Sequence, residues 1–203
     1  TQKVVLKKSL EATTMLGTLF AVIIMANTKQ FVPFFFGKQF IPMTPLMFFF
    51  ALTIIMIPMG GVFANQFALA NRRDKEYAIP VVIGAIIELV LAAILDRPYG
   101  AGGATVAILI TEFVVLILRL WIVRDDYNFK DAFCDVPKYL LIGIITLIAG
   151  MLMPNLITSS FLNMAVKSIL MLIIYAAIMF MMKLDFNQDM IEFVTRFFRK
   201  IKR

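Results

Sequence analysis

Long apolar runs dominate the sequence, and the two within residues 79–123 constrain the fold most. They flank a short turn, DRPYG at residues 96–100, and each is long enough to cross a bilayer as a helix, since a span needs about 20 apolar residues. The chain is 61% hydrophobic and only 16% charged, and its mean hydropathy is +0.89. A soluble domain of 203 residues could not bury so much apolar surface in one core. The sequence therefore predicts an all-α, polytopic membrane protein.

Six transmembrane helices are expected. The polar residues 27–30 should mark the water-facing end of the first helix, although Phe36 is an alternative end. Pro33, Pro42 and Pro45 should prevent a continuous helix through the following turn. In the second span, Pro58 with Gly60 and Gly61 should produce a kink or let a neighbouring helix approach closely. The first and second spans are expected at residues 12–26 and 46–68, and the fifth and sixth at 139–153 and 161–182. The third and fourth are the two apolar runs within 79–123, separated by the turn at 96–100.

Basic residues are distributed unevenly between the two sides that six spans would create. Every Lys and Arg falls on one side except Lys29, Lys38, Arg97 and Lys167. Positive charge marks the cytoplasmic side of a membrane protein, so both ends of this segment should be cytoplasmic. The tail at residues 187–203 places apolar side chains at helical spacing among basic ones, a pattern typical of an amphipathic helix on anionic lipid. We expect it to contact membrane lipids and no nucleic acid.

The residue types exclude several kinds of chemistry. Histidine is absent and Cys134 is the single cysteine, so the sequence offers no imidazole base, no internal disulfide and no multi-cysteine metal site. Gly100, Gly102 and Gly103 lack the preceding strand and the spacing of a phosphate-binding loop. We therefore predict no catalytic residues, no metal and no cofactor, and we expect the chain not to be an enzyme.

Two carboxylates lie near the middle of the apolar runs, Glu88 in the third span and Glu112 in the fourth. A charge at that depth is costly, so it should face protein or water. Glu112 is either a cavity residue that couples to a cation or proton, or a structural carboxylate bonded to another helix. If Glu88 faces Glu112, like-charge repulsion should keep one of them protonated; otherwise Glu88 is simply inside the bundle.

Three further polar positions are candidates for the substrate or ion pathway. Arg119 follows Glu112 by seven residues, on the same helical face and ~10 Å along the axis. It could contact a pyrophosphate, but its place near the helix end favours a side chain that reaches the cytoplasmic headgroups. Asn65 and Gln66 could bind sugar hydroxyls or bond to a neighbouring helix. Lys167, near the outer end of the last span, is better explained as a headgroup anchor.

Some of these segments resemble a known family. FVPFFFGKQF at residues 31–40, the loop RDKEY at 73–77 and YGAGGA at 99–104, with ITE at 110–112, are similar to the C-terminal part of Wzx-type oligosaccharide flippases. These belong to the superfamily that also holds the MATE exporters and the lipid II flippase. The resemblance is densest over residues 31–126. Family members tend to carry Asn where this chain has Glu88 and Ala92, so a role of those Asn residues does not transfer.

The resemblance implies a fold, a division and a function. Residues 1–126 would be the last four helices of the second lobe of a two-lobed MATE/MOP-like transporter, 127–183 two additional helices, and 184–203 the interfacial tail. The missing N-terminal lobe would be a partner, since the chain is expected to be a fragment. The whole protein would move polyprenyl-pyrophosphate-linked oligosaccharide repeat units across the bacterial cytoplasmic membrane for capsule or cell-surface polysaccharide synthesis, with Glu112 at the family's acidic position.

Other functions stay open from the residues alone. A MATE-like drug or cation exporter would be favoured if acidic residues dominated the cavity. A membrane-embedded glycan-assembly enzyme would need a sizeable polar loop, and the loops here are short. A scaffold subunit would leave transport intact when removed.

Overall fold

A computed structural model describes residues 2–126, 133–155 and 157–182 of the protein. Within these ranges every regular element is a helix, which confirms the all-α prediction. Five segments are long and apolar enough to cross a membrane, so the chain is a polytopic membrane protein. The helices are α1 (Gln2–Phe35), η1 (Lys38–Met43), α2 (Thr44–Phe50), α3 (Thr53–Val62), η2 (Phe63–Leu69), α4 (Asp74–Tyr99), α5 (Ala101–Val123), α7 (Val136–Leu152) and α8 (Ser160–Met181). The tail at 184–203 and the connector at 127–132 lie outside the described residues.

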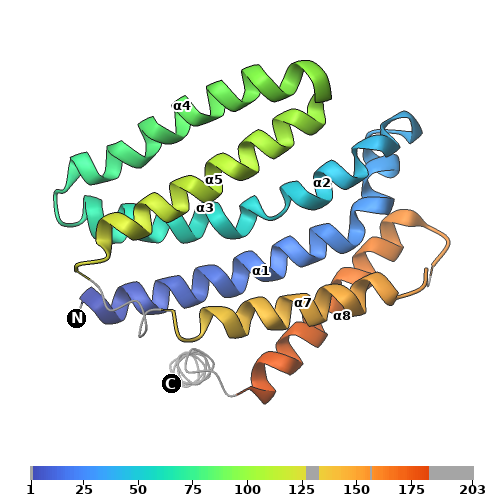
Figure 1. The fold of residues 1–203 in the computed structure, drawn as a ribbon. Coiled ribbons are helices and arrows are strands. Elements are labelled where there is room, and N and C mark those ends of the chain that lie inside the picture. The colour runs from blue at the N-terminus through green and yellow to red at the C-terminus, as the bar shows by residue number, and fades with distance from the viewer. Residues whose placement is uncertain (1, 127–132, 156, 183–203) are drawn as a thin grey trace, which may run out of the picture.

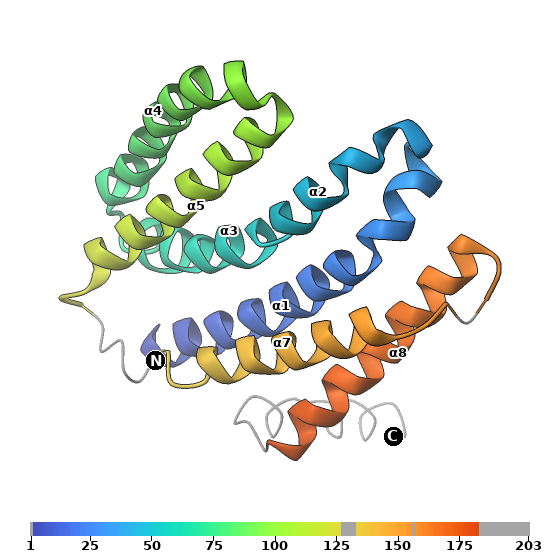
Figure 2. The ribbon, with the colours of Figure 1, turned by 45° about the vertical axis from the view of Figure 1, so that its right-hand side comes forward.

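The predicted fifth span is the shortest. α7 has 17 residues, or ~25 Å of helix at 1.5 Å per residue, which is at the lower limit for crossing a bilayer. It runs beside α1 in both ribbon views (Figures 1 and 2) and packs on α1 and α8. The described residues thus contain five segments long enough to span a membrane, with α7 as a shorter apolar helix beside them. The expected sixth crossing, by α7, stays a prediction.

α1 is the central helix of the bundle, with α2 and α3 on one side and α7 and α8 on the other (Figure 2). One apolar cluster joins α1 to α3, η2 and α5 through residues such as Leu10, Phe63 and Leu116. A second cluster joins α1 to α7 and α8 through Leu19 and Tyr139, among others. The α4–α5 hairpin lies outside α3, so α5 is the helix that connects the hairpin to the core.

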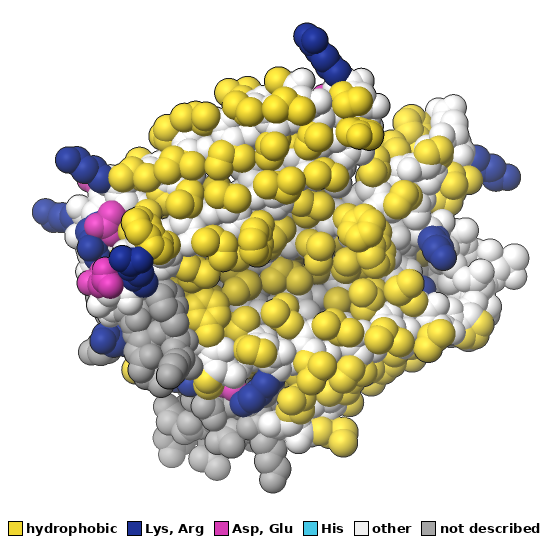
Figure 3. Space-filling model, in the orientation of Figure 1, with side chains coloured by type: hydrophobic (Ala, Val, Ile, Leu, Met, Phe, Trp, Pro, Cys, Tyr) yellow, Lys and Arg dark blue, Asp and Glu magenta, His cyan; other side chains and the backbone are white. Residues whose placement is uncertain are grey.

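The surface also fits a bilayer. Large apolar side chains such as Leu89 and Leu152 are 72% and 78% exposed, and hydrophobic side chains cover the middle of the face in Figure 3. The N-terminus, the α3–α4 connection, the end of α5 and the start of α7 lie together at one end, here called the basic end (Figure 1). Basic and acidic side chains gather there in Figure 3. The other end, called the opposite end, carries the α1–η1, α4–α5 and α7–α8 connections.

α1 continues to Phe35, so the first span does not end at residue 26, and the alternative end at Phe36 is correct to within one residue. Asn27 and Thr28 are buried inside the bundle. Their side chains donate hydrogen bonds to the α1 carbonyls of Ile23 and Met25, at 2.8 and 2.9 Å, so polar residues do not require water here. The expectation that the prolines prevent a continuous helix through this turn is confirmed, since α1 ends at Phe35, two residues after Pro33, and a short 3-10 helix precedes α2. The chain turns at Gly37, whose φ is 98°.

Two other helix boundaries differ from the sequence prediction. The second span is divided into α2 and α3 at Ala51–Leu52, two turns before Pro58, which lies within α3. The turn expected at residues 96–100 is almost absent, because α4 runs through Pro98 to Tyr99 and only Gly100 separates it from α5. Pro98 removes one helical hydrogen bond, and only Tyr99 follows it in α4.

Candidate functional site in the α4–α5 hairpin

Glycines hold the two helices of the hairpin unusually close. Gly100 turns the chain with a φ of 53°, a conformation that L side chains rarely adopt. A Cβ built on Gly103 would lie 2.1 Å from the carbonyl oxygen of Leu95. A Cβ on Gly84 would lie 2.4 Å from Val115 Cγ2, next to Thr111. α4 and α5 therefore approach closely at two levels, backbone against backbone at Gly103 and backbone against side chain at Gly84.

This packing brings the two intramembrane carboxylates into the same neighbourhood. Glu88 lies one turn beyond Gly84 on α4, and Glu112 follows the buried Thr111 on α5. Both side chains are half-buried, and the charge of Glu88 acts on the carboxylate of Glu112. The hydroxyl oxygen of Thr111 is buried without a hydrogen-bond partner in the described structure. Two acids and an unused hydroxyl thus share the middle of the hairpin.

Arg119 belongs to the same group. Its positive charge also acts on Glu112, as the seven-residue spacing on one helical face predicts. Its guanidinium crosses α3 at Gly60, where a built Cβ would lie 2.8 Å from the Nη1 atom. The Nε atom is buried and has no hydrogen-bond partner in the described structure. Gly60 therefore lets a neighbouring side chain approach closely, one of the two roles expected for it.

Asn65 and Gln66 lie on η2, a π-helical segment that continues α3 and contacts α4 and α5. Asn65 is exposed, whereas Gln66 is half-buried. A Cβ built on Gly61 would lie 3.8 Å from the amide nitrogen of Asn65. π-Helical turns occur often at functional sites. The structure thus keeps both residues on the helix that also receives Arg119, and the sequence carried no signal for the π geometry.

The loop RDKEY anchors the hairpin at the basic end. Arg73 donates hydrogen bonds to Glu76, at 2.8 Å, and to Asp126 beyond the end of α5. The bond to Asp126 raises the pKa of Arg73 above its ordinary value, so this guanidinium keeps its charge. In the described residues, no group of three or more His, Cys, Asp or Glu is placed to hold a metal.

A second polar region, missed from the sequence, lies at the opposite end. Asn163 of α8 is buried and donates a 2.9 Å hydrogen bond to Gln30 of α1. Gln30 in turn donates to Asn155 of the α7–α8 connection. Lys167, interpreted above as a headgroup anchor, donates a 2.9 Å hydrogen bond to the carbonyl of Ala26 in α1. Polar residues 27–30 within an apolar run are the available signal in the sequence, although such residues also suit a helix end.

Together, the fold and this hairpin define a polytopic membrane protein whose bundle encloses ionisable side chains, an arrangement typical of transporters. The chain is similar to a protein of Escherichia coli (strain K12) described as "Putative O-antigen transporter", with 23% identity over 123 residues, or 61% of this chain. That stretch is 30% of the E. coli protein, so the chain spans less than a third of this relative. No family model and no solved structure matches the chain.

Proposed function

We propose that the chain is part of a Wzx-type flippase that moves polyprenyl-pyrophosphate-linked oligosaccharide repeat units across the bacterial cytoplasmic membrane. The observation that carries the proposal is the similarity over 123 residues to a protein described as an O-antigen transporter. Residues 1–126 would be the last four helices of its second lobe, with both ends of the chain cytoplasmic. The opposing lobe is a partner of this segment, and no covalent chemistry belongs to the mechanism.

The physical task is to carry a polar head through ~30 Å of hydrocarbon. A hydrated cavity between two lobes that rock alternately accomplishes this while the lipid tail stays in the membrane. In this proposal the α4–α5 hairpin forms one wall of that cavity. Glu112 and Glu88 take up and release a coupling cation or proton, and Arg119 contacts the pyrophosphate. Asn65 and Gln66 offer amide groups to sugar hydroxyls from η2.

A MATE-like drug or cation exporter is the second candidate. The proximity of Glu88 and Glu112 favours it, because two carboxylates suit a cationic substrate. Arg119 counts against it, since a guanidinium whose charge acts on Glu112 opposes cation binding at the same place. The two candidates differ in what a cell accumulates when the protein fails: lipid-linked sugar in one case and the exported drug in the other.

The test is complementation of a strain that lacks the gene for this chain. Lipid-linked repeat units should accumulate in the deletion strain and disappear when the gene is restored. The export rate restored by the Glu112→Gln gene should be at least tenfold lower than the rate restored by the unaltered gene, because the glutamine side chain cannot exchange a proton. Asp96→Asn is the matched control, since this carboxylate lies exposed at the far end of the same hairpin.

The results separate the candidates. Normal lipid-linked sugar levels in the deletion strain, together with drug sensitivity, would replace the flippase with an exporter. Full export by both Glu88→Gln and Glu112→Gln proteins would leave the flippase standing and remove the carboxylates from its mechanism. Accumulation that the unaltered gene cannot reverse would contradict the proposal altogether.

A further inference from the structure

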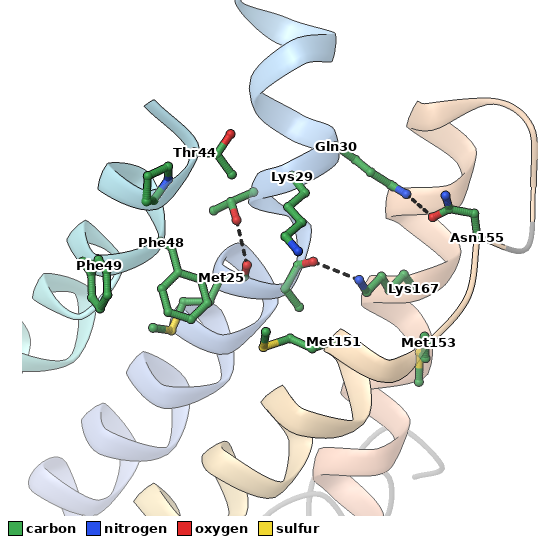
Figure 4. A pocket seen from close by; sticks show the side chains of 13 residues that line it. Met25, Lys29, Gln30, Thr44, Phe48, Phe49, Met151, Met153, Asn155 and Lys167 are labelled. Atoms are coloured by element: carbon green, nitrogen blue, oxygen red, sulfur yellow. Dashed lines mark hydrogen bonds between the residues drawn. The ribbon is translucent and has the colours of Figure 1, made fainter. Parts of the chain in front are cut away.

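A pocket of about 560 Å³ opens at the opposite end, between α1, α2, α7 and α8. It is separate from the Glu88, Glu112 and Arg119 group, since none of these residues lines it. Its polar wall comes from the segment of α1 that interrupts the first apolar run, and its apolar wall includes Phe48 and Met151 (Figure 4). The pocket is therefore an amphipathic site assembled from distant parts of the chain.

Two lysines give the pocket its charge. Lys29 from α1 and Lys167 from α8 extend into the same space in Figure 4, and the charge of Lys29 acts on Lys167. Among the described residues that line the pocket there is no Asp or Glu. In the described structure neither lysine belongs to an ion pair. Two like charges that face one pocket without a counter-charge repel each other, and an anion bound between them would offset that repulsion.

The surrounding hydrogen bonds hold this arrangement in place. Lys167 uses one of its three N–H donors on the carbonyl of Ala26, which fixes the ammonium toward the pocket and leaves two donors available. Gln30 and Asn155, both on the rim, are bonded to each other and to Asn163. The polar wall of the pocket is thus held in place by hydrogen bonds within the protein, before any ligand arrives.

We propose that this pocket binds a phosphate or pyrophosphate group. Lysine is a common phosphate ligand because its ammonium acts as a point charge with several donors. The volume lies in the range of pockets for small molecules, and the Phe and Met side chains of the apolar wall accept an attached hydrocarbon. The phosphate could belong to a lipid headgroup or to a free anion. This inference does not depend on the proposed flippase function.

Binding is measured on the intact protein purified in detergent. Inorganic pyrophosphate is titrated calorimetrically, and retention of phosphatidylglycerol against phosphatidylcholine is followed by native mass spectrometry. The variants are Lys29→Gln, Lys167→Gln and their combination. Lys38→Gln is the control, because Lys38 lies at the same end of the molecule but does not line the pocket. Circular dichroism and size-exclusion chromatography check the fold of each variant.

The double variant should weaken pyrophosphate binding at least tenfold, whereas Lys38→Gln should leave it unchanged. If pyrophosphate does not bind but retention of phosphatidylglycerol falls at least tenfold in the double variant, the natural phosphate is that of a lipid. Lys29→Gln alone should lower affinity several-fold, and because Lys29 is exposed this variant tests the site even if Lys167→Gln fails to fold. No binding of either probe, or equal binding by the unaltered protein and the folded lysine variants, would overturn the proposal.

Discussion

At Gly103 the hairpin leaves no room for a side chain. Alanine there would place its Cβ against the backbone of Leu95, which cannot rotate away as a side chain could. Gly103→Ala should therefore lower the stability of the purified protein by about 2 kcal/mol or more, the usual cost of forcing an extra carbon into a packed site. The measurement is the thermal unfolding midpoint in detergent.

Gly102→Ala is the matched control for this prediction. A Cβ on Gly102 would lie 3.8 Å from a methyl group of Leu46, which is ordinary contact. Alanine should be neutral there, or stabilising by up to about 1 kcal/mol, because it is a better helix former than glycine. Equal midpoints for the two variants would show that α4 and α5 are farther apart than described.

Cys134, just before α7, offers a pH-dependent test. The residue is exposed, but partial desolvation by its neighbours raises the pKa of the thiol above the ordinary 9.0, and the carboxylate of Asp135 raises it further. A raised pKa means less thiolate at a given pH, and the thiolate is the reactive form. Alkylation by N-ethylmaleimide should therefore be slower near pH 8 in the folded protein than in the denatured chain, and should keep rising above pH 9.

Asp135→Asn distinguishes the two causes. Removing the negative charge should move the midpoint of the alkylation profile to lower pH without bringing it to that of the denatured chain, because the partial desolvation of the thiol remains. A midpoint in the unaltered protein equal to that of the denatured chain would mean that the thiol is not perturbed by its surroundings.

Among the elements, α1 and α8 are joined by several hydrogen bonds in the described structure, and the bond from Tyr175 lies deepest in the bundle. Tyr175 donates its hydroxyl to the carbonyl of Met15 at 3.0 Å, in a cluster that includes Tyr139 of α7. Tyr175→Phe removes this bond and keeps the ring, so the loss should be about 1 kcal/mol, as is typical of polar contacts between membrane helices. It is measured as a shift in the SDS concentration that unfolds the protein; Tyr99→Phe, at a position 69% exposed, should produce no shift.

Helix positions were predictable from the sequence, whereas helix ends were not. Apolar runs located α4, α5, α7 and α8 well because only helices satisfy the backbone in lipid. The end of α1 expected at residue 26 and the end expected for α4 differ from the structure because Asn27 and Thr28 bond to their own backbone and Pro98 lies in a last turn. Helical spacing predicts that Glu112 and Arg119 lie on the same face of α5. The contact of Arg119 with Gly60 depends on a third helix and could not be predicted in this way.

The pocket with Lys29 and Lys167 joins residues that are far apart in the sequence, so no local sequence pattern predicts it.

For the whole molecule, the two ends differ in charge in the way that the sequence predicts. Lys3, Lys75 and Lys138 lie in the first turns of α1, α4 and α7 at the basic end, whereas Lys38 lies at the opposite end. We predict that α7 also crosses the membrane, because a separation of charge between two sides requires it. If positive charge marks the cytoplasm, the basic end is cytoplasmic and the phosphate pocket opens toward the outside.

Labelling of engineered cysteines tests this orientation. In a Cys134→Ser background, which removes the single native thiol, a cysteine at position 38 should react with a membrane-impermeant maleimide added to intact cells. A cysteine at position 75 should react only after the cells are opened, because a charged reagent does not cross the hydrocarbon core. A third cysteine, at the exposed Pro154 beyond α7, should behave like position 38. Reaction at 75 but not at 38 in intact cells would invert the orientation, and protection of 154 together with reaction at 38 would mean that α7 does not cross the membrane.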